Sequence, residues 1–211
     1  MDSINFESLN VDKEKQFIEL LNNSSDTDKL SLFFNLQEQR ISVNNRFNEG
    51  FKLYLENQND QEYQKNCNTI TGLISSISKE IIQIENSLYK TQPNWSKTIK
   101  TIRDLEKQKF ILTTKYQILR SEIVGNEELS KHLRTEEQPT GGSCLYEHIE
   151  TCQEQLSTCK NEMNKIINDI NEKLEELRYE LTELNAQTPQ EEIKVTGQCS
   201  HAGHDHDHHH H

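Results

Sequence analysis

The residues with the clearest metal-binding chemistry lie in a histidine-rich segment at residues 199–211. Imidazole and thiolate groups bind Zn²⁺, Ni²⁺ and Cu²⁺, and the interleaved aspartates add oxygen ligands. The predicted metal ligands of this segment are Cys199, His201, His204, His206, His208, His209, His210 and His211. Such a segment can wrap a metal ion without a preformed cage. Two interpretations stay open, a metal-handling function and low-complexity sequence or a cloning remnant without one.

A second group of possible ligands recurs every four residues: Cys144, His148 and Cys152. On a helix this spacing places all three along one side. With a fourth ligand such as His132, they could form a structural zinc site. The CxxC pairs of common zinc sites are missing, however, and the same spacing is typical of the edge of a helix core. We favour core packing over metal binding for this stripe.

The segment from residue 97 to residue 120 is locally basic. Its cations are Lys97, Lys100, Arg103, Lys107, Lys109, Lys115 and Arg120, against the two acids Asp104 and Glu106. A patch of this kind can bind nucleic acid or an acidic partner. The last predicted helix carries complementary acids, namely Glu172, Glu175, Glu176, Glu180 and Glu183. We favour charge pairing between these two helices, because such pairs select neighbours in helical bundles.

Signatures of known enzyme classes are missing from the sequence. It contains no GxxxxGK[ST] loop, no GxGxxG, no GxSxG, no HExxH and no ExxH pair of the di-iron type. Carboxylates are plentiful, but they lie on the polar faces of predicted helices, where nothing holds two of them at a catalytic separation. The sequence therefore predicts a protein that is not an enzyme and needs no cofactor.

Four long amphipathic helices should position these residues. The clearest covers residues 60–90, where apolar residues alternate at steps of four and three: Tyr63, Cys67, Ile70, Ile74, Ile77, Ile81, Ile84 and Leu88. This is the a/d seam of a coiled coil. A first long helix should run from about Ser25 to Asn57, with a buried face formed by Leu30, Phe33, Phe34, Ile41, Phe47, Phe51 and Tyr54.

Two further helices follow a tight turn at residues 91–94, where Pro93 suits a first helical turn. The third should end near Val124, and Gly125 should open a loop over residues 125–142 that leaves room for one helical turn around Glu128–Leu133. The last should run from about residue 143 to residue 186 and extend beyond the others by about ten residues. This extension leaves open a coiled-coil contact with a second molecule, and hence a homodimer.

Long helices joined by short turns fold back on one another to bury their apolar stripes. The predicted fold is therefore all-α, an elongated antiparallel bundle of four long helices with coiled-coil-like packing and a disordered C-terminal tail. Three parts follow: a peripheral N-terminal segment at 1–26 with a helix of two or three turns, the bundle at 27–186, and the histidine-rich tail at 187–211.

The composition of the chain indicates which class of partner and which cellular compartment to expect. The 211 residues carry a formal net charge of −12, which argues against direct nucleic-acid binding and makes a protein the expected partner. We find neither a signal peptide nor an apolar run that could span a membrane. Five cysteines, three of them on apolar helix faces, suit reduced thiols. We expect an intracellular protein, nuclear or cytoplasmic, without membrane association.

Several helical motifs resemble a known family. They are Leu36–Arg40 (LQEQR), Arg46–Phe47 with Gly50–Phe51, Leu105–Lys109 (LEKQK) with Leu112–Thr113, and Ile170–Arg178 (INEKLEELR). Together they resemble the eukaryotic "required for excision" B-type domain family over about residues 30–180. The resemblance implies a small helical protein linked to DNA excision repair, with no catalytic residues to carry over. It does not extend to the histidine-rich tail.

The sequence thus supports two functions of different classes. The first is a non-enzymatic helical adaptor or scaffold, an accessory factor in DNA excision repair that binds a protein partner through the bundle surface. The alternative is a metal-binding protein that acts through its tail with zinc, copper or nickel.

Overall fold

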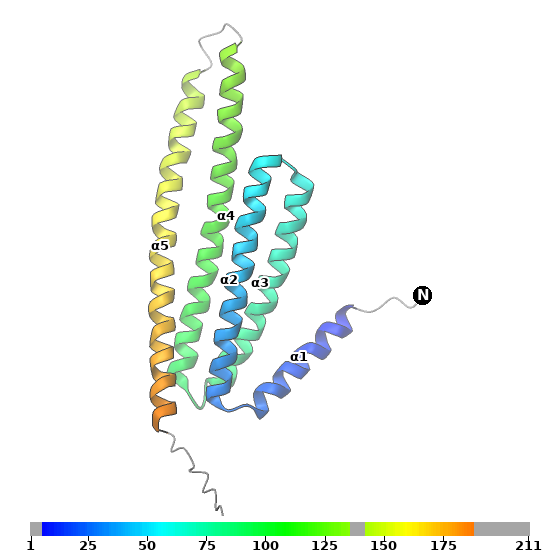
Figure 1. Cartoon of the computed structure of the whole chain (residues 1–211), viewed down its shortest axis with the longest axis vertical. Coiled ribbons are helices and arrows are strands. Elements are labelled where there is room, and N and C mark those ends of the chain that lie inside the picture. The colour runs from blue at the N-terminus through cyan, green and yellow to red at the C-terminus, as the bar shows by residue number, and fades with distance from the viewer. Residues whose placement is uncertain (1–5, 136–141, 188–211) are drawn as a thin grey trace, which may run out of the picture.

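Five α-helices make up the described part of the chain (Figure 1). The computed structural model describes residues 6–135 and 142–187, and within these ranges every regular element is helical. The helices are α1 (Phe6–Asn23), α2 (Asp26–Asn57), α3 (Asp60–Leu88), α4 (Pro93–Thr135) and α5 (Gly142–Gln187). The all-α prediction is confirmed. None of the described helices combines the length and apolarity that crossing a membrane requires.

Local signals in the sequence set most helix boundaries. At the start of α2, the Ser25 hydroxyl accepts a hydrogen bond from the Asp28 backbone N–H at 3.1 Å, and the Asp28 carboxylate accepts one from the Ser25 N–H. This capping box satisfies two backbone donors that the first turn leaves free. Pro93 begins α4 as predicted, because its missing N–H is not needed in a first turn.

Two predicted segments differ from the structure. The loop expected at residues 125–142 is wrong over its first part, because α4 continues through Gly125 to Thr135. One glycine costs a helix interior only about 1 kcal/mol, and the helix-forming residues that follow offset this cost. The N-terminal helix of two or three turns is also longer than expected, since α1 spans 18 residues.

The long helices pack as two antiparallel hairpins, α2 with α3 and α4 with α5 (Figure 1). Helix α4 also packs on α3, and α1 lies against α3. The extension predicted for the last helix is present, but α4 is nearly as long and accompanies it past the α2–α3 turn. We call this two-helix extension the stem. The contacts do not confirm a regular four-helix bundle, because they are concentrated within the hairpins.

Two apolar clusters hold the helices together. The large one draws residues from all five helices and includes Leu21, Phe33, Ile81, Trp95 and Ile170. The small one lies in the stem, where Leu119 and Ile123 of α4 meet Ile149 and Cys152 of α5. The seam predicted on α3 is confirmed: Ile70, Ile77, Ile81, Ile84 and Leu88 are buried in the large cluster, and Cys67 and Ile74 pack against it.

The buried face of α2 differs from the prediction at one position. Ile41 was expected in the core but is 52% exposed, whereas the polar Gln37 and Arg40 are 4% and 3% exposed. The prediction used only the spacing of apolar residues. It therefore assigned Ile41 to the core and left out the polar Gln37 and Arg40. The helix is therefore rotated slightly from the expected orientation.

The seam predicts the effect of a charge placed in the core. We expect Ile81→Asp to lower the free energy of unfolding by about 3 kcal/mol or more, because it removes a fully buried side chain and buries an unpaired carboxylate. The matched control is Ile82→Asp at a neighbouring position that is 37% exposed, where the change should stay within about 1 kcal/mol. Urea unfolding followed by circular dichroism measures both. Equal effects would show that the seam does not face the core.

Candidate functional site

A groove runs between α2 and the α4–α5 hairpin. It arises because α2 packs closely on α3, whereas α5 lies on the other side of α4 (Figure 1). The groove has a volume of about 530 Å³. Its lining residues are Ile41, Asn44, Asn45, Asn48, Phe51, Lys52, Leu55, Lys109, Thr113, Tyr116, Arg120, Met163, Asn164 and Ile167. Ile41 of α2, which was expected in the core, thus lines this groove.

The groove combines exposed apolar groups with positive charge. Ile41 and Ile167 are 52% and 40% exposed, so both present apolar surface to the groove. Lys52, Lys109 and Arg120 supply three cations, and no acidic residue lines the groove. At one edge the Lys160 ammonium lies 5.7 Å from the centre of the Tyr116 ring. The groove is therefore apolar and locally basic in a chain of net charge −12.

A buried polar layer lies at the level of Arg40. Nη2 of Arg40 on α2 donates a hydrogen bond to the Ser78 hydroxyl of α3 at 2.9 Å. Glu106 of α4 is 5% exposed and pairs with Lys109 at 2.7 Å. We call Arg40, Ser78 and Glu106 the Arg40 layer. It joins α2, α3 and α4, and through Lys109 it reaches the groove.

The electrostatics of Arg40 reflect its burial. Desolvation lowers the pKa of its guanidinium below the usual value, the Glu106 charge opposes this shift, and the Arg103 charge adds to it. Two of its nitrogens, Nε and Nη1, are buried without a hydrogen-bond partner in the protein. The charge on Glu106 is therefore the main compensation for a buried cation.

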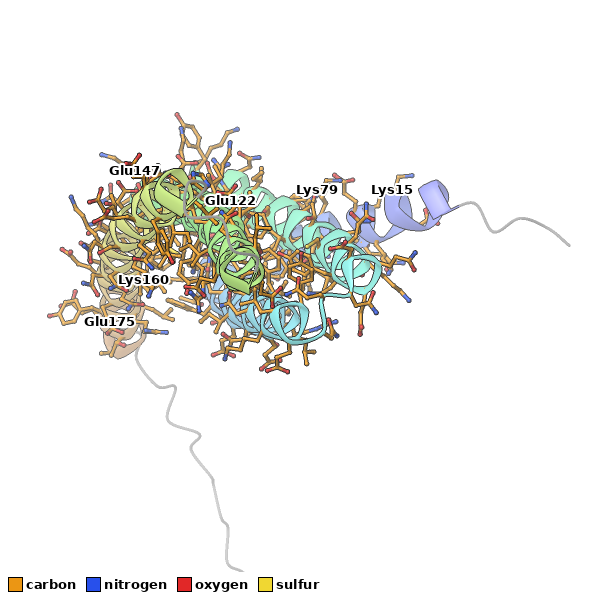
Figure 2. All side chains as sticks on the ribbon, turned by 90° about the horizontal axis from the view of Figure 1, so that it is seen from above. Lys15, Lys79, Glu122, Glu147, Lys160 and Glu175 are labelled. Atoms are coloured by element: carbon orange, nitrogen blue, oxygen red, sulfur yellow. The ribbon has the colours of Figure 1, made fainter. Side chains whose placement is uncertain are left out.

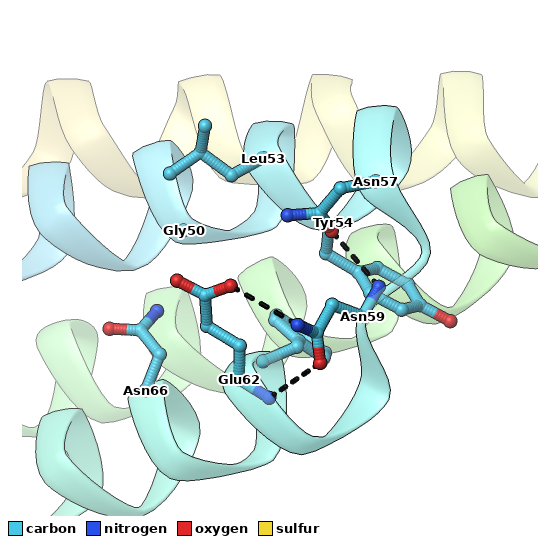
Figure 3. A pocket seen from close by; sticks show the side chains of 8 residues that line it. Gly50, Leu53, Tyr54, Asn57, Asn59, Glu62 and Asn66 are labelled. Carbon is cyan, nitrogen blue, oxygen red and sulfur yellow. Dashed lines mark hydrogen bonds between the residues drawn. The ribbon is translucent and has the colours of Figure 1, made fainter.

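The α2–α3 turn fixes the far end of α2, beside the groove. Gly50 of α2 faces Asn66 of α3, and a Cβ atom at Gly50 would lie 2.0 Å from Asn66 Nδ2 (Figure 3). The two helices therefore approach more closely here than a side chain allows. Next to this contact Tyr54 and Tyr63 stack with ring centres 4.6 Å apart. The Tyr63 hydroxyl donates to Gln117 Oε1 of α4 at 2.6 Å, which ties the turn to α4.

Burial also changes the chemistry of this aromatic group. Desolvation is the largest cause that raises the pKa of Tyr63 well above its usual value, and Cys67 adds to it. The hydroxyl therefore stays protonated and acts as a donor. Because the Tyr63 ring lies 6.0 Å from the Phe51 ring, this cluster also positions one wall of the groove.

The structure describes only some of the predicted metal ligands. The tail residues Cys199 to His211 lie outside the described residues, so metal binding by the tail stays a prediction. The side chains of Cys144 and His132 are also outside the described part. Of the remaining stripe, Cys152 is 3% exposed and belongs to the stem core, while His148 is exposed. Burial is the main cause that raises the pKa of the Cys152 thiol, with a contribution from Glu122.

The expected pairing between basic α4 and acidic α5 does not occur in the described residues. Arg103 pairs with Glu85 of α3 at 3.0 Å, and Lys109 pairs with Glu106 of its own helix. On α5, Glu175 and Glu176 pair with Arg178 and Lys173 of the same helix. Helical neighbours three residues apart reach one another more easily than partners across an interface. Instead, Glu180 accepts a hydrogen bond from the Trp95 indole across that interface.

Residues 28–120 match the family described as DNA repair REX1-B. This confirms the resemblance predicted from the helical motifs for that stretch, although the motif at residues 170–178 lies outside it. The matched stretch contains the Arg40 layer and the Gly50–Asn66 approach, so those motif residues are explained by packing. No curated protein and no solved structure matches the chain.

The Arg40 layer predicts coupled effects on stability. Glu106→Leu should lower the free energy of unfolding by about 3 kcal/mol or more, because it leaves Arg40 buried without its counter-charge. In an Arg40→Met background the same change should cost less than half as much. Chemical denaturation of the unchanged protein, the two single variants and the double variant measures this coupling. Asp104→Leu, at an exposed acid of the same helix, is the control and should have little effect. Equal costs in both backgrounds would contradict the pairing.

The Gly50–Asn66 approach predicts a second coupling. In an Asn66→Ala background, Gly50→Ala should stabilise the protein by up to about 1 kcal/mol, because alanine favours the helix. With Asn66 present that gain should disappear, since the new Cβ meets the half-buried amide. Thermal unfolding of the unchanged protein, the two single variants and the double variant measures how the effect of Gly50→Ala depends on Asn66. The same stabilisation in both backgrounds would show that Asn66 moves aside freely.

Proposed function

We propose that this chain, whose residues 28–120 match a family named for DNA repair, is a non-enzymatic helical adaptor in that process. In this proposal the groove between α2 and the α4–α5 hairpin binds an acidic, amphipathic helical segment of a partner protein. The observation that carries it is the composition of the groove. Three cations and exposed isoleucines line a depression in an otherwise acidic protein.

The shape of the groove suits a helix as ligand. Its wall on α2 and its wall on α4 and α5 come from long helices that run side by side, so the depression between them is elongated. Helices that bind in such grooves insert apolar residues at spacings of three and four. Here Ile41 and Phe51 lie on one wall, and Met163 and Ile167 lie on the other. Apolar side chains of a bound helix would contact both walls.

The charges select an acidic partner. Lys52 is exposed and Arg120 is half-buried, and both line the groove, whereas Lys109 pairs with Glu106, the carboxylate that also acts on Arg40. Charge complementarity increases the association rate and excludes basic competitors. The same groups could contact phosphates, but the net charge of −12 repels a nucleic acid at longer range. A protein ligand therefore fits the charge distribution better than DNA.

The groove predicts the effect of charge reversal on peptide binding. The probe is a labelled helical peptide with leucines at spacings of three and four and glutamates between them. The double variant Lys52→Glu, Arg120→Glu should weaken its binding by about tenfold or more, because attraction becomes repulsion. The control is Lys65→Glu, Lys79→Glu, which changes two exposed cations of α3 by the same net charge and should leave binding unchanged. Fluorescence anisotropy measures the dissociation constants.

The same variants test the repair role in cells. Cells that lack the protein are complemented with the unchanged chain, the groove variant or the α3 control, and the removal of ultraviolet-induced DNA lesions is followed over time. The groove variant should behave like the empty vector, and the control should restore repair. Normal repair with the groove variant would show that the groove is not the surface used. Normal repair without any protein would contradict the repair role itself.

A further inference from the structure

Three side chains of types that bind metals converge in the stem, just beyond the end of the groove, where Glu122 follows the groove residue Arg120 by two positions on α4. Glu122 of α4 meets His148 and Cys152 of α5, which lie one helical turn apart. The Cys152 sulfur is 3.6 Å from Glu122 Oε2 and 3.7 Å from His148 Nε2. His148 Nε2 is 3.9 Å from the same Glu122 oxygen. We call these three residues the stem triad.

The separations within the stem triad fit tetrahedral coordination. With bonds of about 2.3 Å to sulfur and about 2.0–2.1 Å to nitrogen and oxygen, ligand atoms of a tetrahedral zinc site lie roughly 3.3 to 3.6 Å apart. Of the observed separations, the 3.6 Å from sulfur to oxygen lies at the upper end of this range, whereas the 3.7 Å from sulfur to nitrogen and the 3.9 Å from nitrogen to oxygen lie above it. Small side-chain rotations would therefore be enough to place all three atoms around one ion.

The chemistry of the donors favours zinc over harder cations. A thiolate, an imidazole and a carboxylate form the mixed sulfur, nitrogen and oxygen set that zinc accepts, whereas Mg²⁺ and Ca²⁺ take oxygen ligands. A thiolate and a carboxylate also balance the two positive charges of the ion. The buried thiol of Cys152 has its polar contacts with the other two members of the triad, Glu122 and His148.

The surroundings of the stem triad leave one side open. The side chains of Glu122 and His148 are 47% and 53% exposed, while Cys152 is buried among the apolar residues of the stem. Figure 2 looks along the helices and shows Glu122 on α4 together with the nearby α5 end that carries Glu147. An ion can therefore enter from solvent, and a water molecule can fill the fourth position.

We propose that Glu122, His148 and Cys152 bind a Zn²⁺ ion that clamps α4 to α5 in the stem. The clamp acts where the apolar contact between the two helices is smallest: four buried residues form the stem cluster among the described residues. Because the triad contains Glu122 from one helix and two ligands from the other, binding cross-links the hairpin. None of the three ligands lines the groove or belongs to the histidine-rich tail.

The test uses the full chain with the tail ligands replaced, Cys199→Ser with its seven histidines changed to asparagine, so that tail binding cannot contribute. Co²⁺ is the probe, because a cobalt–thiolate bond gives a near-ultraviolet charge-transfer absorption. The expected result is one Co²⁺ bound per chain with this absorption, and its displacement by Zn²⁺. Zn²⁺ should also raise the melting temperature of this protein.

Single variants assign the ligands. Cys152→Ser should abolish the charge-transfer absorption, and Glu122→Gln and His148→Ala should each weaken Co²⁺ binding about tenfold or more. The last two change exposed side chains, so the fold is expected to persist, and circular dichroism verifies this. The controls Glu147→Gln, an exposed acid of α5, and Cys67→Ser should leave the affinity unchanged.

Three outcomes of the Co²⁺ measurements would overturn the proposal. They are the absence of the absorption in the parent protein, an absorption that survives Cys152→Ser but disappears with Cys144→Ser, and an affinity that neither Glu122→Gln nor His148→Ala changes. A rise in melting temperature with Zn²⁺ that persists in His148→Ala would also contradict a clamp at the stem triad.

Discussion

The burial of Arg40 constrains how α2, α3 and α4 fit together. A guanidinium removed from water is costly unless a counter-charge and hydrogen-bond acceptors stand at fixed positions. Ser78 of α3 accepts one hydrogen bond and Glu106 of α4 supplies the counter-charge, while Nε and Nη1 of Arg40 have no partner within the protein. A shift of α2 by one turn would separate Arg40 from Ser78 and from Glu106. The apolar seam thus drives association, and the Arg40 layer distinguishes one register from the others.

The same constraint gives the groove its character. Because Gln37 and Arg40 face inward, Ile41 is turned toward the surface beside α4 and α5. Glu106, which balances Arg40, also engages Lys109 at the edge of the groove. The packing of Arg40 therefore explains two features of the groove, the exposure of Ile41 and the pairing of Lys109 with Glu106. The buried charge of Arg40 therefore affects both the packing of the helices and the chemistry of the groove, and Arg40 lies within the stretch that matches the family.

Sequence periodicity predicted the helices better than their contacts. The α3 seam is regular enough to give both the helix and its buried face, and Ser25 and Pro93 mark helix starts by local chemistry. Gly125 was misleading because one glycine only weakens a helix. The groove could not be predicted from the sequence, and for the stem triad the sequence indicated only His148 and Cys152, together with Cys144. Glu122 is one of many exposed acids on a polar face, and only the pairing of α4 with α5 brings it to His148 and Cys152.

The stem has a consequence for how the molecule opens. Helix α4 is continuous, but its two halves belong to apolar clusters of very different size, one shared by five helices and one built by two. Regions with few buried contacts open at lower free energy than the global core. Amide hydrogens in the stem should therefore exchange with solvent through local fraying, whereas those around Ile81 and Trp95 exchange only through global unfolding. We therefore expect the two halves of α4 to unfold as separate cooperative units.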